Sequence, residues 1–163
     1  MNRIVLGVDP GSLNTGFGVV QGDHEGRLAL LASGRIAASP RWPREKRLCR
    51  IYDGLKELID RYQPQALALE EVFLATNVQS ALALGQVGGV VLLAAAHASL
   101  PVFQYTPLVV KKAVVGYGRA SKTQVQLMVE HFLGEKVADD HAADALAVGL
   151  CHLFQPRWLP PKL

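Results

Sequence analysis

Acidic residues follow two short apolar segments of the chain. The segment "IVLGV" (4–8) runs directly into Asp9, and "QALAL" (65–69) runs into Glu70 and Glu71. Sites in α/β sheets form at the carboxyl ends of adjacent strands. If these two segments are neighbouring strands, their carboxylates converge near apolar walls, where mutual repulsion is costly unless a cation is bound. A hard divalent metal ion would relieve that repulsion.

A third group of titratable residues lies in the segment "DDHAADALA" (139–147). His141 and Asp144 are three residues apart, so they share one face of a helix. The alanines around them are small enough to let that helix lie close to a sheet. Asp139 and Asp140 are most simply explained as helix caps. The candidate catalytic residues and metal ligands are therefore Asp9, Glu70 or its neighbour Glu71, His141 and Asp144.

Hydrophobic periodicity and turn residues define the elements that must position these side chains. Strands are predicted at 3–9, 15–21, 27–37, 65–70 and 101–106. Helices are predicted from Pro43 to just before Pro64, at 77–98, from a cap at Ser121 onward, and at 140–154. The first three strands are thus joined by hairpins, and the later strands by crossover connections. The order predicts an α/β fold, a five-stranded mixed sheet (three antiparallel strands, then parallel crossovers) flanked by helices, in a single domain (1–155) with a C-terminal tail (156–163).

The composition is that of a packed globular protein. Of the 163 residues, 50% are hydrophobic and 19% are charged, which argues against a disordered chain. The longest apolar stretch, residues 87–100, is too short to span a bilayer, and no signal peptide is recognisable. Cys49 and Cys151 are too isolated to indicate a disulfide framework or a zinc site. We therefore expect a soluble cytoplasmic protein that does not associate with a membrane.

Basic residues gather in two parts of the chain, although the formal net charge is only +3 and the pI is about 9.0. The clusters are "RWPREKRLCR" (41–50) and "KKAVVGYGRASK" (111–122). Charge alone does not distinguish nucleic-acid binding from a solvated helix face and a flexible loop. The candidate DNA contacts in these clusters are Arg44, Arg47, Lys111, Arg119 and Lys122.

Four segments of the chain resemble the RuvC family of crossover (Holliday) junction endodeoxyribonucleases, within the retroviral-integrase and ribonuclease H-like superfamily. They are "GVDPGSLNTGFGVV", "LEEVFLATNVQSALALGQVGGV", "VVKKAVVGYGRASKTQVQ" and "HAADALAV". The resemblance covers residues 3–154 and implies a ribonuclease H-like fold. It implies a homodimer that binds a four-way DNA junction and nicks two opposing strands symmetrically, in homologous recombination and DNA repair. The implied cofactor is Mg²⁺, two ions per active site, with Mn²⁺ as a substitute, and the implied partners are the RuvA and RuvB branch-migration proteins.

The resemblance also assigns roles to residues around the DNA. Strand alternation leaves the choice between Glu70 and Glu71 open, and the resemblance selects Glu70, because the family's acid follows the apolar strand immediately. Phe73 would stack on bases near the exchange point of the junction. Lys111 and Lys122 match lysines that the family uses near DNA, where they would neutralise phosphate charge.

For the candidate ligands, the resemblance implies a two-metal scheme. In that scheme Asp9 bridges both ions, Glu70 and Asp144 each hold one, and His141 completes the shell. Many family members carry an aspartate where this chain has His141. A neutral imidazole can still bind a metal ion or carry a proton, so we interpret the change as a variant of the site.

Three other functions are compatible with parts of the sequence. The segment "GVDPGSLNTGFG" (7–18) resembles the phosphate-binding hairpin of actin-like ATPases and sugar kinases, but that architecture needs two lobes and 163 residues provide one. A noncatalytic junction-binding module would keep the fold, although the complete set of acids argues against it. A ribonuclease H-like nuclease acting on RNA is the third alternative. Cleavage of branched DNA, linear duplex and an RNA hybrid under one metal condition would decide among them.

Overall fold

The computed structural model describes residues 2–71 and 77–155, so Phe73 and the predicted tail lie outside the described residues. The strands are β1 (Arg3–Asp9), β2 (Asn14–Gly22), β3 (Leu28–Ala37), β4 (Ala66–Glu70) and β5 (Val102–Tyr105). The helices are α1 (Arg44–Tyr62), α2 (Val78–His97), α3 (Pro107–Val115), α4 (Lys122–Leu133) and α5 (Asp140–Leu153).

The strands form one mixed sheet in the order β3-β2-β1-β4-β5. β1 pairs antiparallel with β2, and β2 with β3. β1 and β4 are parallel, as are β4 and β5, and parallel neighbours require crossover connections such as the one that contains α2. This is the predicted ribonuclease H-like arrangement, and it makes the two strands that end in acids direct neighbours.

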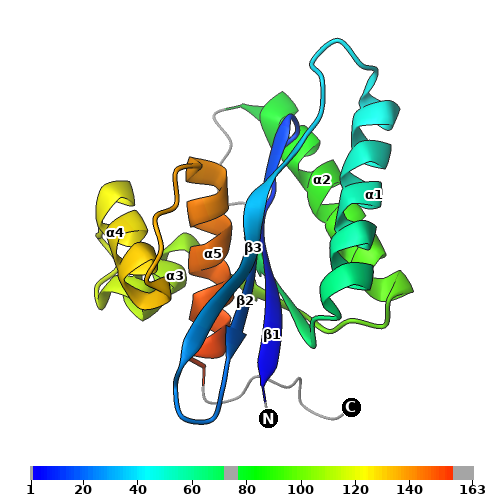
Figure 1. The fold of residues 1–163 in the computed structure, drawn as a ribbon. Coiled ribbons are helices and arrows are strands. Elements are labelled where there is room, and N and C mark those ends of the chain that lie inside the picture. Colours follow the sequence, from blue (N-terminus) through cyan, green and yellow to red (C-terminus); the bar gives the residue numbers. More distant parts are fainter. Residues whose placement is uncertain (1, 72–76, 156–163) are drawn as a thin grey trace.

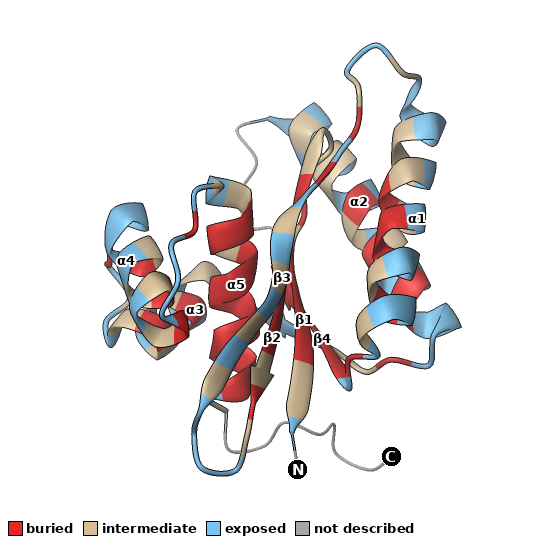
Figure 2. Cartoon of the chain, in the orientation of Figure 1, coloured by how far each residue is buried: buried red, intermediate tan, exposed pale blue. Residues whose placement is uncertain are grey.

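Helices cover both faces of the sheet (Figure 1). α1 and α2 pack on one face, and α3, α4 and α5 lie on the other. Side chains alternate along a strand, so Val5 of β1 faces the α5 side, whereas Leu6 and Val8 face the α1 and α2 side. α5 is the central helix of its layer, and all of its residues from Ala145 to Leu153 are buried (Figure 2).

Glycines in the strands let α5 lie directly on the sheet. A Cβ atom at Gly7 of β1 would overlap the carbonyl oxygen of Ala145, and one at Gly16 of β2 would overlap that of His141. Helix and strands therefore meet backbone to backbone, as the alanines of α5 predict. Because Gly16 pairs with Asp9, the first turn of α5 is held beside the end of β1.

The prediction of two helices after β5 is wrong, because the described part of the chain contains three. The additional helix is α3, whose valine-rich segment "PLVVKKAVV" has little helical periodicity. Its ends do carry helix signals. Thr106 accepts a hydrogen bond from the Val109 N–H, Pro107 occupies the first turn, and Gly116 (φ 100°) ends the helix in the left-handed conformation. α3 carries Lys111, one of the predicted DNA contacts.

α2 buries only part of its surface within the protein. Its buried residues are Val87, Val91, Ala94 and Ala95. In contrast, Val78 is 75% exposed and Leu82 is 64% exposed. Among the described helices, α2 is the one that is long and apolar enough to cross a membrane by length and composition. That is weak support for a membrane span, because a helix that packs against a core or a second chain has the same composition.

Candidate active site

Two carboxylates meet where β1 and β4 end. The parallel register of these strands places their last residues, Asp9 and Glu70, at the same edge of the sheet. The Asp9 side chain is only 19% exposed, and Glu70 is half-buried. Glu71 instead extends the pairing of β4 with β5, since its backbone N–H donates to the Tyr105 carbonyl oxygen.

The first two turns of α5 bring His141 and Asp144 to the same place. His141 Nδ1 lies 4.0 Å from Asp9 Oδ2. Asp144 is close enough for its charge to raise the pKa of both Asp9 and Glu70. The fold therefore gathers the four candidate ligands from β1, β4 and α5.

Asp139 anchors the start of α5 as a helix cap. Its side chain accepts hydrogen bonds from the backbone N–H groups of His141 (2.9 Å) and Ala142 (3.1 Å). Arg35 of β3 adds an ion pair, with 3.4 Å between its Nε and Asp139 Oδ2. Sequence reasoning missed Arg35, because an isolated arginine in an alternating strand has no motif around it. Only the pairing of β3 with β2 brings Arg35 to the start of α5.

The carboxyl groups of Asp9 and Glu70 have strongly raised pKa values. Burial, and then the charge of Asp144, raises the pKa of Asp9 from 3.8 to about 6. Burial, and then the charge of Asp9, raises the pKa of Glu70 from 4.5 to about 8. Two partly buried carboxyl groups that interact do not both ionise at low cost, so a bound cation would favour their ionised forms.

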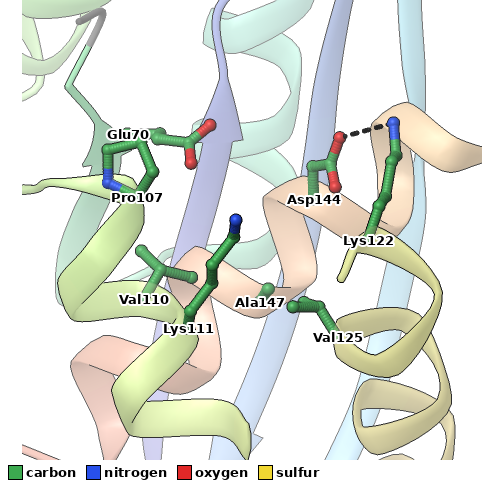
Figure 3. Close-up of a pocket in the computed structure, with 8 residues that line it drawn as sticks. All are labelled: Glu70, Pro107, Val110, Lys111, Lys122, Val125, Asp144 and Ala147. Atoms are coloured by element: carbon green, nitrogen blue, oxygen red, sulfur yellow. Dashed lines mark ion pairs between the residues drawn. The ribbon is translucent and has the colours of Figure 1, made fainter. Parts of the chain in front are cut away.

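A cavity of about 210 Å³ opens beside Glu70 and Asp144 (Figure 3), and neither Asp9 nor His141 is among its described lining residues. Glu70 and Asp144 lie on opposite sides of it, and Lys111 of α3 and Lys122 of α4 extend toward it. Lys122 Nζ is 3.1 Å from Asp144 Oδ2 and 3.7 Å from Asp140 Oδ2. The apolar walls, which sequence reasoning missed along with α3, are Pro107, Val110, Val125 and Ala147. The cavity therefore offers carboxylates to a cation and ammonium groups to a phosphate.

The carboxylates of Asp9, Glu70 and Asp144 suit a hard divalent cation, although they do not surround a common point. Within residues 2–71 and 77–155, no three His, Cys, Asp or Glu side chains form a ready ligand cluster. Figure 3 shows the reason, since the Asp144 carboxylate is paired with Lys122 across the cavity from Glu70. Exchange of the lysine for a metal ion would free Asp144 to act as a ligand. The three carboxylates are the ligand type that magnesium and manganese sites use, whereas an imidazole is more typical of transition-metal sites.

The family model for "Crossover junction endodeoxyribonuclease RuvC" matches residues 5–152, which include all four candidate ligands. The chain belongs to the RuvC family. RuvC of Pelotomaculum thermopropionicum is 48% identical over 158 residues, which cover 95% of this chain and 95% of that protein. RuvC of Moorella thermoacetica is 48% identical over 157 residues, covering 95% of this chain and 93% of that protein.

Solved RuvC structures share the fold described above. T. thermophilus RuvC in complex with Holliday junction substrate is 39% identical, with a TM-score of 0.87 over 93% of each chain. A second Thermus thermophilus RuvC structure is 40% identical, with a TM-score of 0.85 over 93% of this chain and 94% of that chain. The predicted fold class and RuvC membership are thereby confirmed.

The predicted DNA contacts of this RuvC chain fall in different places. Lys111 and Lys122 line the candidate active-site cavity. Arg119 is exposed in the loop between α3 and α4 and does not line that cavity. Arg44 and Arg47 line a second cavity, beside α2.

Proposed function

We propose that this chain is a metal-dependent endonuclease that resolves four-way DNA junctions by nicking two opposing strands. The observation that carries this proposal is the convergence of Asp9, Glu70 and Asp144, from distant parts of the sequence, beside a cavity that Glu70, Asp144 and two lysines line. Such carboxylate groups are typical of sites that cleave phosphodiesters with divalent metal ions. RuvC family membership, and the likeness to a RuvC solved with a Holliday junction, support the choice of substrate.

The cofactor in this proposal is Mg²⁺, two ions per active site, with Mn²⁺ as a substitute. The RuvC family consists of divalent-metal-dependent nucleases, and the raised pKa values of Asp9 and Glu70 indicate a place where positive charge is favoured. Asp9, Glu70, Asp144 and His141 would hold the ions. When bound, divalent ions activate a water molecule and stabilise the leaving oxygen of a phosphodiester.

The cationic side chains of the site bind and orient the DNA backbone. Lys111 and Lys122 place two ammonium groups at the cavity, where they neutralise phosphate charge and release counterions. Lys122 is paired with Asp144 in the protein alone, and a phosphate group gives it another partner. Arg119, exposed in the same basic segment, extends the positive surface beyond the cavity.

The homodimer in this proposal forms through α2. Its exposed apolar side chains are Val78, Leu82, Leu92 and Leu93. Covering this face with a second copy removes these side chains from water, and a two-fold dimer supplies the two active sites that symmetric nicking needs. The proposal also includes cooperation with RuvA and RuvB and a cytoplasmic location, both of which family membership supports.

The test of this function compares three substrates under one metal condition. With Mg²⁺, we expect nicks at two symmetric positions of a synthetic four-way junction, and much slower cleavage of linear duplex and of an RNA–DNA hybrid. Chelation of the metal should stop cleavage. Preferential cleavage of the hybrid would instead indicate a nuclease that acts on RNA, and binding of the junction without nicking would indicate a noncatalytic module.

Replacing His141 tests whether its imidazole takes part in the site. His141→Asp should preserve nicking, because a carboxylate is also a metal ligand, whereas His141→Ala should impair it. Initial nicking rates of the two variants and of the unaltered protein, under one metal condition, measure these effects. A harmless His141→Ala would remove His141 from the site.

A further inference from the structure

A second cavity lies between the turn that follows β1, the start of α1 and the middle of α2. Its volume is about 70 Å³, several times the roughly 10–15 Å³ that admits one water molecule. Its polar lining consists of Ser12, Arg44, Arg47 and Gln86, and the rest is apolar. The cavity is therefore large enough, and polar enough on one side, to receive a small charged group.

The charge of this cavity is positive and uncompensated. None of its described lining residues is acidic, and neither Arg44 nor Arg47 makes an ion pair within residues 2–71 and 77–155. The Nε atom of Arg47 is fully buried and has no hydrogen-bond partner among those residues. Buried donors without a partner are rare in native proteins, so the described residues leave the hydrogen-bonding capacity of the Arg47 guanidinium group incompletely used. The ligand that two guanidinium groups recognise best is an oxyanion, above all a phosphate or carboxylate.

The turn after β1 lies beside both this cavity and the candidate active site. Ser12 lies in that turn, only three residues after Asp9. The other polar residues come from α1 and α2, on the opposite face of the sheet from α5. The second cavity and the candidate active site therefore lie on opposite faces of the sheet, and Ser12 places the second cavity near the end of β1.

We propose that this second cavity binds one backbone phosphate of the junction, at a distance from the phosphodiester that is cut. Arg47 would donate hydrogen bonds from its planar guanidinium group, and Ser12 and Gln86 would add a hydroxyl and an amide donor. A phosphate held between α1, α2 and the β1–β2 turn fixes the register of the strand relative to the carboxylates. This inference rests on the proposed function and adds a second anchoring point for the same substrate.

Binding of a labelled four-way junction without divalent metal, measured at several salt concentrations, tests the inference. Arg47→Met keeps an unbranched aliphatic side chain and removes the guanidinium group. It should weaken binding about tenfold near 0.1 M salt and reduce the salt slope of the binding constant by about one. Arg61→Met is the matched control, because Arg61 lies exposed in the last turn of the same helix, and it should change affinity less than about twofold.

Two further variants make the test specific to the cavity. Relative to Arg47→Met, Arg47→Lys should restore the salt slope but not the full affinity for the junction, since an ammonium group lacks the planar set of donors of a guanidinium group. Arg44 is exposed, so Arg44→Met should weaken binding without affecting the unfolding temperature, and it replaces Arg47→Met if that variant does not fold.

Equal effects of Arg47→Met and Arg61→Met, or full recovery of affinity by Arg47→Lys, would overturn the cavity assignment alone. Failure of the unaltered protein to bind the junction would overturn the proposed function as well.

Discussion

Replacing Asp9, Glu70 or Asp144 by its amide should abolish nicking and leave junction binding largely intact. Each replacement keeps the size of the side chain but removes a carboxylate from the set that would hold the metal ions. We expect the nicking rate to fall by at least about 10³-fold, equivalent to about 4 kcal/mol of transition-state stabilisation. Binding should persist because the phosphate contacts come from lysines and arginines. Single-turnover nicking and binding of one synthetic junction measure the two effects on Asp9→Asn, Glu70→Gln and Asp144→Asn.

Two neighbouring acids provide matched controls for this experiment. Glu71→Gln changes the residue next to Glu70 whose backbone pairs with β5, and Asp140→Asn changes an exposed acid in the first turn of α5. Both should retain most of the nicking activity. Full activity in any of the three site variants would exclude that residue from the site, and loss of junction binding in all three would point to misfolding.

Glu70→Gln should stabilise the folded protein although it abolishes nicking. At pH 8 we expect the metal-free variant to be more stable than the metal-free unaltered protein. In the folded protein the pKa of Glu70 is raised from 4.5 to about 8, and that of Asp9 from 3.8 to about 6. The folded state therefore binds more protons than the unfolded state between about pH 4 and pH 8, so stability falls as pH rises through this range. An amide cannot ionise and avoids that loss. Because one pKa unit corresponds to about 1.4 kcal/mol, we expect Glu70→Gln to stabilise the protein by at least about 1 kcal/mol at pH 8.

Urea unfolding in the presence of a chelator, at pH 5 and pH 8, measures this effect. The unaltered protein should be less stable at pH 8 than at pH 5, and the difference should shrink in Glu70→Gln. Adding Mg²⁺ at pH 8 should stabilise the unaltered protein more than the variant, because a cation that binds only the folded state stabilises it. Glu71→Gln again serves as the control. Stability of the unaltered protein that rises from pH 5 to pH 8 would contradict the proposed electrostatics of the carboxyl pair.

Much of the fold could be predicted because its main elements have strong local patterns. β1 is predicted at its observed bounds, and the ends of the other four predicted strands differ from the observed ones by one residue or less. The start of α4 is marked by a capping box in which Ser121 and Gln124 satisfy each other's backbone N–H groups. α3 was missed because its valines weaken the helical pattern, and its cap at Thr106 is a short motif that occurs in many turns.

The candidate ligands could also be named from the sequence, since each lies at the end of an element with a clear pattern. Asp9 ends an apolar strand, and His141 and Asp144 share the spacing of one helix face. The choice of Glu70 over Glu71 came only from the resemblance. In the structure Glu70 lines the cavity while the backbone of Glu71 pairs with β5, which agrees with that choice.

The sequence by itself determined which strands end in carboxylates, which helix carries the other candidate ligands, and to which family the chain is similar. Only the tertiary structure decided that Lys122 pairs with Asp144, that burial and neighbouring charge raise the pKa values of Asp9 and Glu70, and that Arg47 lines a second cavity. The physical reason is the separation along the chain of the residues that each effect joins. Periodicity and caps act over a few residues of one segment, whereas ion pairs, burial and raised pKa values depend on the distances between segments that are far apart in the chain.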